Sequence, residues 1–211
     1  MLLHLVLLST TLVAVNGCAV TGPWRLAKQR QGIELYLQEY PDSAIPEFKG
    51  VVTINTSLQN VMSMLTDFSS WPDWVYGCRH AEVVRTLGYS EAYLYQITDL
   101  PLISDRDALL HGVTKVDESG NEIVIHVEAA PRYCDNNDIS GCRLPNESRL
   151  VRVTQLNGSF HLKKLGPDKV LVTWRQHVEP GGGVPDWITR FMLSKVPMRS
   201  LQKLKQRLEG S

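Results

Sequence analysis

The chain has 211 residues, of which 43% are hydrophobic, and its 22 Lys and Arg residues balance its 22 Asp and Glu residues. This composition is that of a globular domain and excludes a disordered, collagen-like or disulfide-stapled chain. A net charge of zero offers no basic surface to a nucleic-acid backbone, so we expect no nucleic-acid partner. The length suits one domain, expected to be a monomer, that is large enough to enclose a cavity.

The first residues are typical of an export signal. An uncharged apolar stretch runs from Leu2 to Val15, which is too short for a membrane-spanning helix and fits the hydrophobic region of a signal peptide. No Lys or Arg precedes it; only the α-amino group and His4 supply polarity there. We therefore predict that residues 1–17 are a signal peptide and that residues 18–211 are the mature domain.

The residues after this stretch suggest a lipid anchor. Val15-Asn16-Gly17-Cys18 resembles the lipobox of bacterial lipoproteins, in which the Cys thiol receives a diacylglyceryl group. We predict an exported, periplasmic protein that is membrane-anchored through Cys18. Simple cleavage after Gly17 or Ala19, which would give a soluble secreted or periplasmic protein, is the alternative.

The mature chain begins with short helices and strands. Residues 22–30 are predicted to form a short polar helix that Gly32 ends. Alternating side chains over residues 33–38 indicate a strand, and a second strand follows the turn at 41–43, so the two form a hairpin. Ser57 is a typical N-cap for the next helix, and Trp71–Trp74 forms a second short turn.

From Cys78 to Glu179 the chain is predicted to be a long antiparallel meander. The expected strands are residues 80–86, 91–98, 106–115, 122–129, 149–156, 159–164 and 169–179. Turn-forming residues separate most of them, and the Asn157-Gly158 pair is a typical hairpin turn.

Cys134 and Cys142 enclose a polar, turn-rich segment within this meander. In an oxidising compartment we expect them to form a disulfide across this short loop. A divalent-cation loop built from Asp135, Asn137 and Asp138 is the alternative, but it lacks the acidic alternation and terminal Glu of an EF-hand. Cys78 would remain as a buried free thiol.

An amphipathic helix is predicted after the Gly181–Gly183 tripeptide. Pro185 suits its first position, and Pro197 inside it predicts a kink. Its apolar stripe consists of Trp187, Ile188, Phe191, Met192, Leu201, Leu204 and Leu208. Six basic and two acidic residues follow Gly183, so this segment has a net charge of +4 and is expected to contact a membrane surface.

This order of elements is that of an α+β domain. A strongly curved antiparallel sheet that wraps around the last helix leaves a space that neither element can fill alone. We therefore expect an apolar cavity between the sheet and the long C-terminal helix.

Several short motifs occur in a specific order along the chain. They are Trp24 and Gly32-Ile33, Asp67 and Trp71–Trp74, Pro101 with Arg106-Asp107, Val172-Thr173-Trp174, and Gly183-Val184-Pro185. In this order and spacing, residues 24–208 resemble the START domain (steroidogenic acute regulatory protein-related lipid transfer) of the helix-grip superfamily. The resemblance implies the helix-grip fold and a cavity for a lipid or other hydrophobic small molecule, with no cofactor.

Two departures limit what this resemblance implies. Steroid-binding members have a buried acid on the strand before the Arg-Asp motif and an arginine six residues after its Arg. Ungapped pairing places Gln96 and Gly112 in those slots, so no sterol-specific polar anchor is expected. The candidate ligand-binding residues are Tyr95, Arg106, Asp107, Leu110, Trp174, Trp187, Phe191 and Met192.

Two pairs of His and Glu residues could carry chemistry other than ligand binding. His126 and Glu128, and likewise His177 and Glu179, share one face of a strand and could bind a metal or relay protons. We expect the first pair to point to solvent, because the opposite face of that strand is apolar. The Arg106-Asp107 pair is expected to form a buried ion pair at the pocket rim.

The sequence contains no common nucleophile, metal or phosphate-binding motif, so we predict no catalytic residue and no metal site. The predicted function is non-enzymatic binding and transfer, or sensing, of a lipid in a cavity gated by the C-terminal helix. The alternative is a helix-grip enzyme with cyclase or hydrolase chemistry on an apolar substrate, in which His111 or the Arg106-Asp107 pair acts as the acid-base group.

Overall fold

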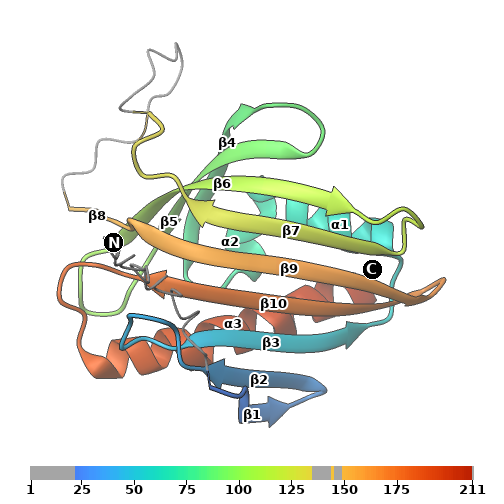
Figure 1. Cartoon of the computed structure of the whole chain (residues 1–211), viewed down its shortest axis with the longest axis horizontal. Coiled ribbons are helices and arrows are strands. Elements are labelled where there is room, and N and C mark those ends of the chain that lie inside the picture. The colour runs from blue at the N-terminus through green and yellow to red at the C-terminus, as the bar shows by residue number, and fades with distance from the viewer. Residues whose placement is uncertain (1–21, 135–143, 145–148, 211) are drawn as a thin grey trace, which may run out of the picture.

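The computed structural model describes residues 22–134, 144 and 149–210. In this part of the chain, ten strands form one curved sheet, and the helices lie together behind it (Figure 1). The strands are β1 (Arg25–Arg30), β2 (Ile33–Gln38), β3 (Glu47–Ile54), β4 (Cys78–Thr86), β5 (Glu91–Thr98), β6 (Arg106–Val116), β7 (Glu122–Ala129), β8 (Val151–Arg152), β9 (Gln155–Gly166) and β10 (Lys169–Glu179). The helices are α1 (Leu58–Thr66), the 3-10 helix η1 (Phe68–Ser70), α2 (Trp71–Trp74) and α3 (Asp186–Glu209).

In this sheet, the strands from the beginning of the chain pair with a strand from near its end. Its strand order is β1-β2-β3-β10-β9-β7-β6-β5-β4, and the two-residue β8 pairs in parallel with the start of β6. Neighbouring strands along this order are antiparallel, and β3 pairs with β10 so that Val52 lies opposite Val172. The last strand therefore closes onto the first hairpin, and the sheet curves around α3, which packs against β2 and β3.

Buried and more exposed side chains alternate along the strands, and the buried ones lie on the side of the sheet that the helices cover. Val172 and Trp174 of β10 and Leu162 of β9 are buried beneath the helices, whereas residues between them are more exposed. Gly50 of β3 lets α3 approach closely, since a Cβ there would lie only 2.5 Å from Cδ1 of Leu201. The predicted α+β fold, a curved antiparallel sheet around a long C-terminal helix, is confirmed.

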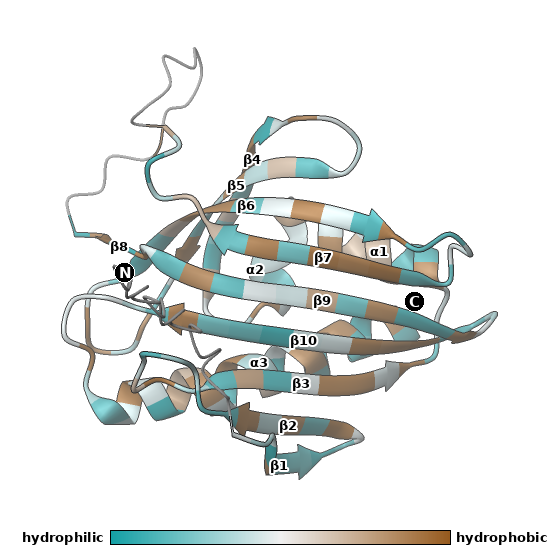
Figure 2. Cartoon of the chain, in the orientation of Figure 1, coloured by the Kyte–Doolittle hydropathy of each residue, from teal (hydrophilic) through white to brown (hydrophobic). Residues whose placement is uncertain are grey.

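The predicted helix over residues 22–30 is wrong, because residues 25–30 form the edge strand β1. Gln31 and Gly32 both have positive φ angles, 53° and 72°, as in a type I′ hairpin turn that pairs Arg30 with Ile33. Figure 2 shows β1 as a hydrophilic strand, and all six of its residues are exposed. Hairpin pairing with β2 therefore prevails over the local helix propensity of these residues.

The predicted strands 149–156 and 159–164 are also wrong in their bounds. Only Val151 and Arg152 form β8, and β9 runs from Gln155 to Gly166 straight through the expected Asn157-Gly158 turn. Gly158 serves close strand packing instead, because a Cβ at this position would lie 2.9 Å from the carbonyl oxygen of Arg175.

The other helices follow the prediction closely. Ser57 caps α1, and its hydroxyl accepts a hydrogen bond from the backbone N–H of Asn60 at 3.2 Å. Pro185 is the N-cap of α3, which begins one residue later and continues through the buried Pro197. Because Pro197 has no N–H, it cannot donate to the carbonyl of Leu193.

Several predicted features fall outside the described residues. These are the signal peptide, the acylated Cys18, the cation loop at 135–138, and Cys142, so the disulfide of Cys134 with Cys142 stays a prediction. Cys78 is a buried free thiol, as expected, and burial raises its pKa to about 12.

Candidate functional site

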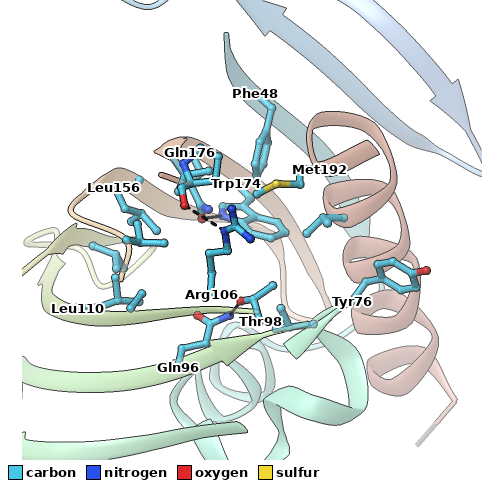
Figure 3. Close-up of a pocket in the computed structure, with 18 of the residues that line it drawn as sticks. Phe48, Tyr76, Gln96, Thr98, Arg106, Leu110, Leu156, Trp174, Gln176 and Met192 are labelled. Carbon is cyan, nitrogen blue, oxygen red and sulfur yellow. Dashed lines mark hydrogen bonds between the residues drawn. The ribbon is translucent and has the colours of Figure 1, made fainter. Parts of the chain in front are cut away.

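A cavity of about 120 Å³, here called the central cavity, lies between the concave face of the sheet and helices α2 and α3 (Figure 3). Most of its lining is apolar. These residues are Phe48, Trp71, Trp74, Val75, Leu100, Ala108, Leu110, Val127, Val153, Leu156, Phe160, Trp174, Val178, Met192, Leu193 and Val196. One water-sized group needs about 10–15 Å³, so the cavity holds about ten such groups.

Aromatic rings form one side of the central cavity. The ring of Trp174 stacks on Phe160 with a centroid separation of 5.2 Å and meets Phe48 edge-on at 5.0 Å. The indole N–H of Trp174 donates to Gln176 Oε1 at 3.3 Å. By contrast, the fully buried indole N–H of Trp74 has no hydrogen-bond partner in the described part of the chain.

Arg106 is the charged side chain on this wall and is only 4% exposed. Its Nε donates to the carbonyl of Pro180 at 3.1 Å, Nη2 donates to that of Gly181 at 3.0 Å, and Nη1 donates to that of Ser104. Burial lowers the pKa of Arg106, while the nearby Asp105 acts in the opposite direction. Arg106 thus ties the start of β6 to the segment that leads into α3.

The expected ion pair between Arg106 and Asp107 is wrong, because consecutive residues of a strand point to opposite faces. The Asp107 carboxylate accepts hydrogen bonds from Arg152 Nε at 3.0 Å and Nη2 at 2.7 Å. It also accepts one from the Tyr95 hydroxyl at 3.0 Å. Asp107 therefore holds β8 against β6.

The structure brings some of the predicted ligand-binding residues together. Arg106, Leu110, Trp174 and Met192 line the central cavity, and Asp107 borders it with its carboxylate engaged elsewhere.

The remaining candidates lie elsewhere. Tyr95 is buried with Ile97 and Leu109 in a separate cluster on the other face of the sheet. Trp187 is 44% exposed, and Phe191 lies beside Tyr76, with ring centroids 6.0 Å apart.

The acid-base groups considered for an enzyme do not meet in the cavity. His111 follows the inward-facing Leu110, so it lies on the outer face, where its ring nitrogens are 2.8 Å from Glu91 and 3.4 Å from Glu128. His126 and Glu128 are exposed, as predicted. His177 is buried, stacks on Tyr40 at 3.6 Å and lies 3.3 Å from Glu179.

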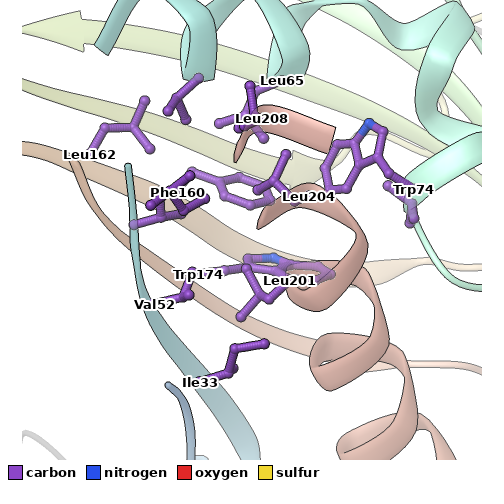
Figure 4. Close-up of a cluster of buried hydrophobic side chains, with 14 of the residues drawn as sticks. Ile33, Val52, Leu65, Trp74, Phe160, Leu162, Trp174, Leu201, Leu204 and Leu208 are labelled. Carbon is purple, nitrogen blue, oxygen red and sulfur yellow. The ribbon is translucent and has the colours of Figure 1, made fainter. Parts of the chain in front are cut away.

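The two halves of α3 differ in how firmly they are held. In the anchor segment, residues 197–209, Leu201, Leu204 and Leu208 pack into the main core beside Trp174 and Leu65 (Figure 4).

Three basic side chains of this segment are also tied to the fold. Lys203 donates to the Asp73 carbonyl at 3.2 Å, Lys205 donates to the Thr53 carbonyl at 2.9 Å, and Arg207 pairs with the Asp73 carboxylate at 3.2 Å.

The first half of α3, residues 186–196, is held more weakly. It buries Ile188 and Leu193, and its other residues are half-buried or exposed. Below it, the Ser200 hydroxyl donates to the Val196 carbonyl at 2.7 Å and accepts from the Tyr76 N–H at 2.9 Å. This contact marks the border between the loosely packed and the anchored half.

Two negative findings apply to the described residues. None of their helices combines the length and apolar character needed to cross a bilayer. Their His, Cys, Asp and Glu side chains also form no group of three or more that could hold a metal ion.

Comparison with known families assigns the chain. The model of the START domain matches residues 21–211. The chain belongs to the START-domain family. The assignment agrees with the curved sheet, the long last helix and the cavity between them.

Proteins of similar length match this START domain in sequence, and solved structures match its fold. An uncharacterised protein of Pseudomonas aeruginosa is 25% identical over 209 residues, which cover 99% of this chain and 98% of that protein. The crystal structure of a STAR-related lipid transfer protein from Xanthomonas axonopodis matches with a TM-score of 0.75 and 28% identity, covering 88% of this chain and 98% of the other. Human StAR-related lipid transfer protein 5 has the same fold, with a TM-score of 0.76 and 15% identity over 89% of this chain and 86% of its own.

The two slots that depart from steroid-binding START domains both face the concave side. Gln96 lines the central cavity, and its Nε2 donates to Thr98 Oγ1 at 3.3 Å. Gly112 lies opposite Ala92 on the neighbouring strand. The central cavity is also lined by three residues that were not among the predicted candidates, Thr98, Gln176 and Trp74. The alternation of inward and outward side chains along a strand could have identified Thr98 and Gln176.

Proposed function

We propose that this START domain binds one lipid or other apolar molecule in the central cavity and carries or senses it without chemical change. The observation that carries the proposal is the apolar cavity beneath α3, with Arg106 and a few hydrogen-bonding groups on its wall. The Xanthomonas and human relatives, which are named as lipid transfer proteins, support it. No described side-chain arrangement favours cyclase or hydrolase chemistry over binding.

The polar end of the ligand lies near Arg106. A guanidinium has more N–H groups than the three backbone carbonyls occupy, so it can donate to a ligand oxygen. The unpaired indole N–H of Trp74, a residue of α2 that also lines the cavity, is a second donor. A buried cation and an unpaired donor both gain from an acceptor, so the ligand carries an anionic or oxygen-rich end.

The first half of α3, residues 186–196 and here called the lid segment, controls entry. Its side chains Met192, Leu193 and Val196 cover the cavity, while the anchor segment stays fixed in the core. Gly181, Gly182 and Gly183 all have positive φ angles between 62° and 66°, which is backbone that glycine adopts without strain. Movement between this tripeptide and Pro197 opens the cavity without unfolding the core.

A membrane surface favours the open lid. Arg190 and Lys195 are exposed on the lid segment, and each basic residue near an anionic membrane contributes about 1 kcal/mol of binding. The exposed Trp187 adds an aromatic side chain suited to the membrane interface. An acylated Cys18 at a periplasmic membrane face would hold the domain within reach of this surface.

The test is to tether the lid and measure lipid exchange between vesicles. In a Cys78→Ala background, Tyr76→Cys and Phe191→Cys place thiols on the two residues whose rings are 6.0 Å apart, and a short reducible bifunctional reagent links them. The linked protein should lose exchange of a fluorescent phospholipid, and reduction of the link should restore it.

The matched control links the anchor segment instead. Asp73→Cys with Lys203→Cys joins residues already in hydrogen-bond contact at 3.2 Å, so this link should leave exchange unchanged. Equal exchange by the linked and reduced lid variants would contradict the lid, and absence of exchange by the unlinked wild-type protein would contradict transfer.

A further inference from the structure

We propose that a second chamber beyond the central cavity receives the apolar tail of the ligand, and that Gly112 sets the tail length that fits. This inference rests on the proposed function. The second chamber, here called the distal chamber, has a volume of about 280 Å³. It lies under the concave faces of β5, β6 and β7, between the end of α1 and the turn that joins β4 to β5.

The distal chamber exists because two small residues face each other across the sheet. Ala92 of β5 and Gly112 of β6 are direct cross-strand partners, so no bulky side chain fills the space in front of them. A Cβ added at Gly112 would meet nothing closer than the Ala92 carbonyl oxygen at 3.7 Å, which is ordinary contact. The backbone therefore tolerates a side chain at this position, and glycine leaves the chamber open.

The two cavities share a wall. Trp71, Val127 and Phe160 line both, and Trp71 is fixed by a hydrogen bond from its indole N–H to the Leu65 carbonyl at 3.1 Å. The proposal requires the side chain of Val127 or Phe160 to move so that the two spaces join. The joined space is a bent channel from Arg106 to the β4–β5 turn.

Volume indicates which ligand needs both cavities. The central cavity holds about ten water-sized groups, whereas the distal chamber adds about twenty at the same volume per group. A single-chain amphiphile of ordinary lipid length exceeds the central cavity alone and fits the two together.

Charge determines which end of the amphiphile lies in which cavity. Glu91 is the charged residue among the described lining of the distal chamber, but its carboxylate lies on the outer face, 2.8 Å from His111. The inner wall, which includes Leu65, Phe68 and Leu94, is therefore apolar. An anionic end would lose its hydration against this apolar wall, whereas Arg106 attracts it, so the head lies in the central cavity and the tail in the distal chamber.

The experiment measures binding of straight-chain carboxylic acids, from octanoic to palmitic acid, by isothermal titration calorimetry. In the wild-type protein each further methylene should tighten binding by about four-fold up to palmitic acid, the value for burying one methylene. Gly112→Phe should bind octanoic acid like the wild type but gain nothing beyond lauric acid, because the ring occupies the distal chamber.

Val113→Phe is the matched control, since Val113 follows Gly112 in β6 and points to the opposite face. It should keep the wild-type dependence on chain length. If Gly112→Phe does not fold, Ala92→Leu narrows the same chamber and should give the same plateau.

A wild-type plateau at lauric acid, or an unchanged chain-length profile in Gly112→Phe, would overturn the distal chamber while leaving ligand binding in the central cavity intact. Binding of no acid of any length by the wild-type protein would overturn the proposed function together with this inference.

Discussion

Replacing Asp107 by Asn should reduce the free energy of unfolding by about 2–3 kcal/mol without weakening ligand binding. The Asp107 carboxylate is 4% exposed and accepts two hydrogen bonds from Arg152 and one from Tyr95. Breaking a fully buried ion pair costs about 3–5 kcal/mol. The Arg152 side chain is 32% exposed and recovers part of its hydration, which reduces the loss.

The assay is a double-mutant cycle by urea denaturation at neutral pH with Asp107→Asn, Arg152→Met and the double variant. Because the two side chains act together, the double variant should lose at least about 1 kcal/mol less than the sum of the single losses. Asp105→Asn is the matched control, because the Asp105 carboxylate is 30% exposed and lies 3.9 Å from Arg79. The Leu100 N–H that donates to Asp105 Oδ1 at 3.2 Å can also donate to the amide oxygen of Asn, so the loss should be less than about 1 kcal/mol.

Strictly additive losses would refute the pairing. Loss of ligand binding in Asp107→Asn with stability unchanged would instead make Asp107 a ligand-binding residue.

Four further outcomes are expected. Gly158→Ala should reduce stability by about 1–3 kcal/mol in a thermal melt, because its Cβ would lie 2.9 Å from the Arg175 carbonyl oxygen, and an unchanged melting temperature would contradict this packing. Burial lowers the pKa of His177 in the folded state, with Glu179 and Glu47 opposing the shift, so the unfolded chain binds the proton more readily and the free energy of unfolding should decrease below about pH 6.5. His177→Gln should make this decrease shallower, and an equally steep decrease in the variant would contradict the role of His177. Thiol labelling of the denatured, unreduced mature protein should modify Cys78 alone, and labelling of Cys134 and Cys142 would exclude their disulfide. Intact-mass analysis should show a mature chain that begins at an acylated Cys18, and a chain that begins there without acyl mass, or at Val20, would exclude the anchor.

Hydrophobic patterning was sufficient to predict most of this fold. Strands such as β7 and β10 and the capped helix α1 have regular alternation or helical spacing, and the apolar stripe of α3 includes the deeply buried Leu201 and Leu204. The predictions were wrong where a local sequence signal, such as helix propensity or a turn-forming pair, conflicts with the pairing of strands in the sheet. The helix-forming residues of β1 are held by a hairpin, and Gly158 meets a steric need inside a strand rather than a turn.

The site was predicted less completely, because a side chain's face depends on register. Of the candidate ligand-binding residues, Arg106 and Leu110 line the central cavity, whereas Tyr95 lies in a separate cluster on the other face of the sheet. Pairing of Thr98 with Arg106 puts Gln96 on the concave face and Tyr95 on the other. The rotation of α3 that exposes Trp187 depends on its packing against β2 and β3, which the sequence pattern does not specify.

Mass spectrometry of the organic extract from purified, natively folded protein tests the central claim most directly. The account predicts an unmodified amphiphile with an anionic or oxygen-rich end, in a ratio close to one per protein chain, that Met192→Ala retains less well than the wild type. An extract without any apolar molecule, together with failure of the purified protein to take up lipid from vesicles, would contradict the account.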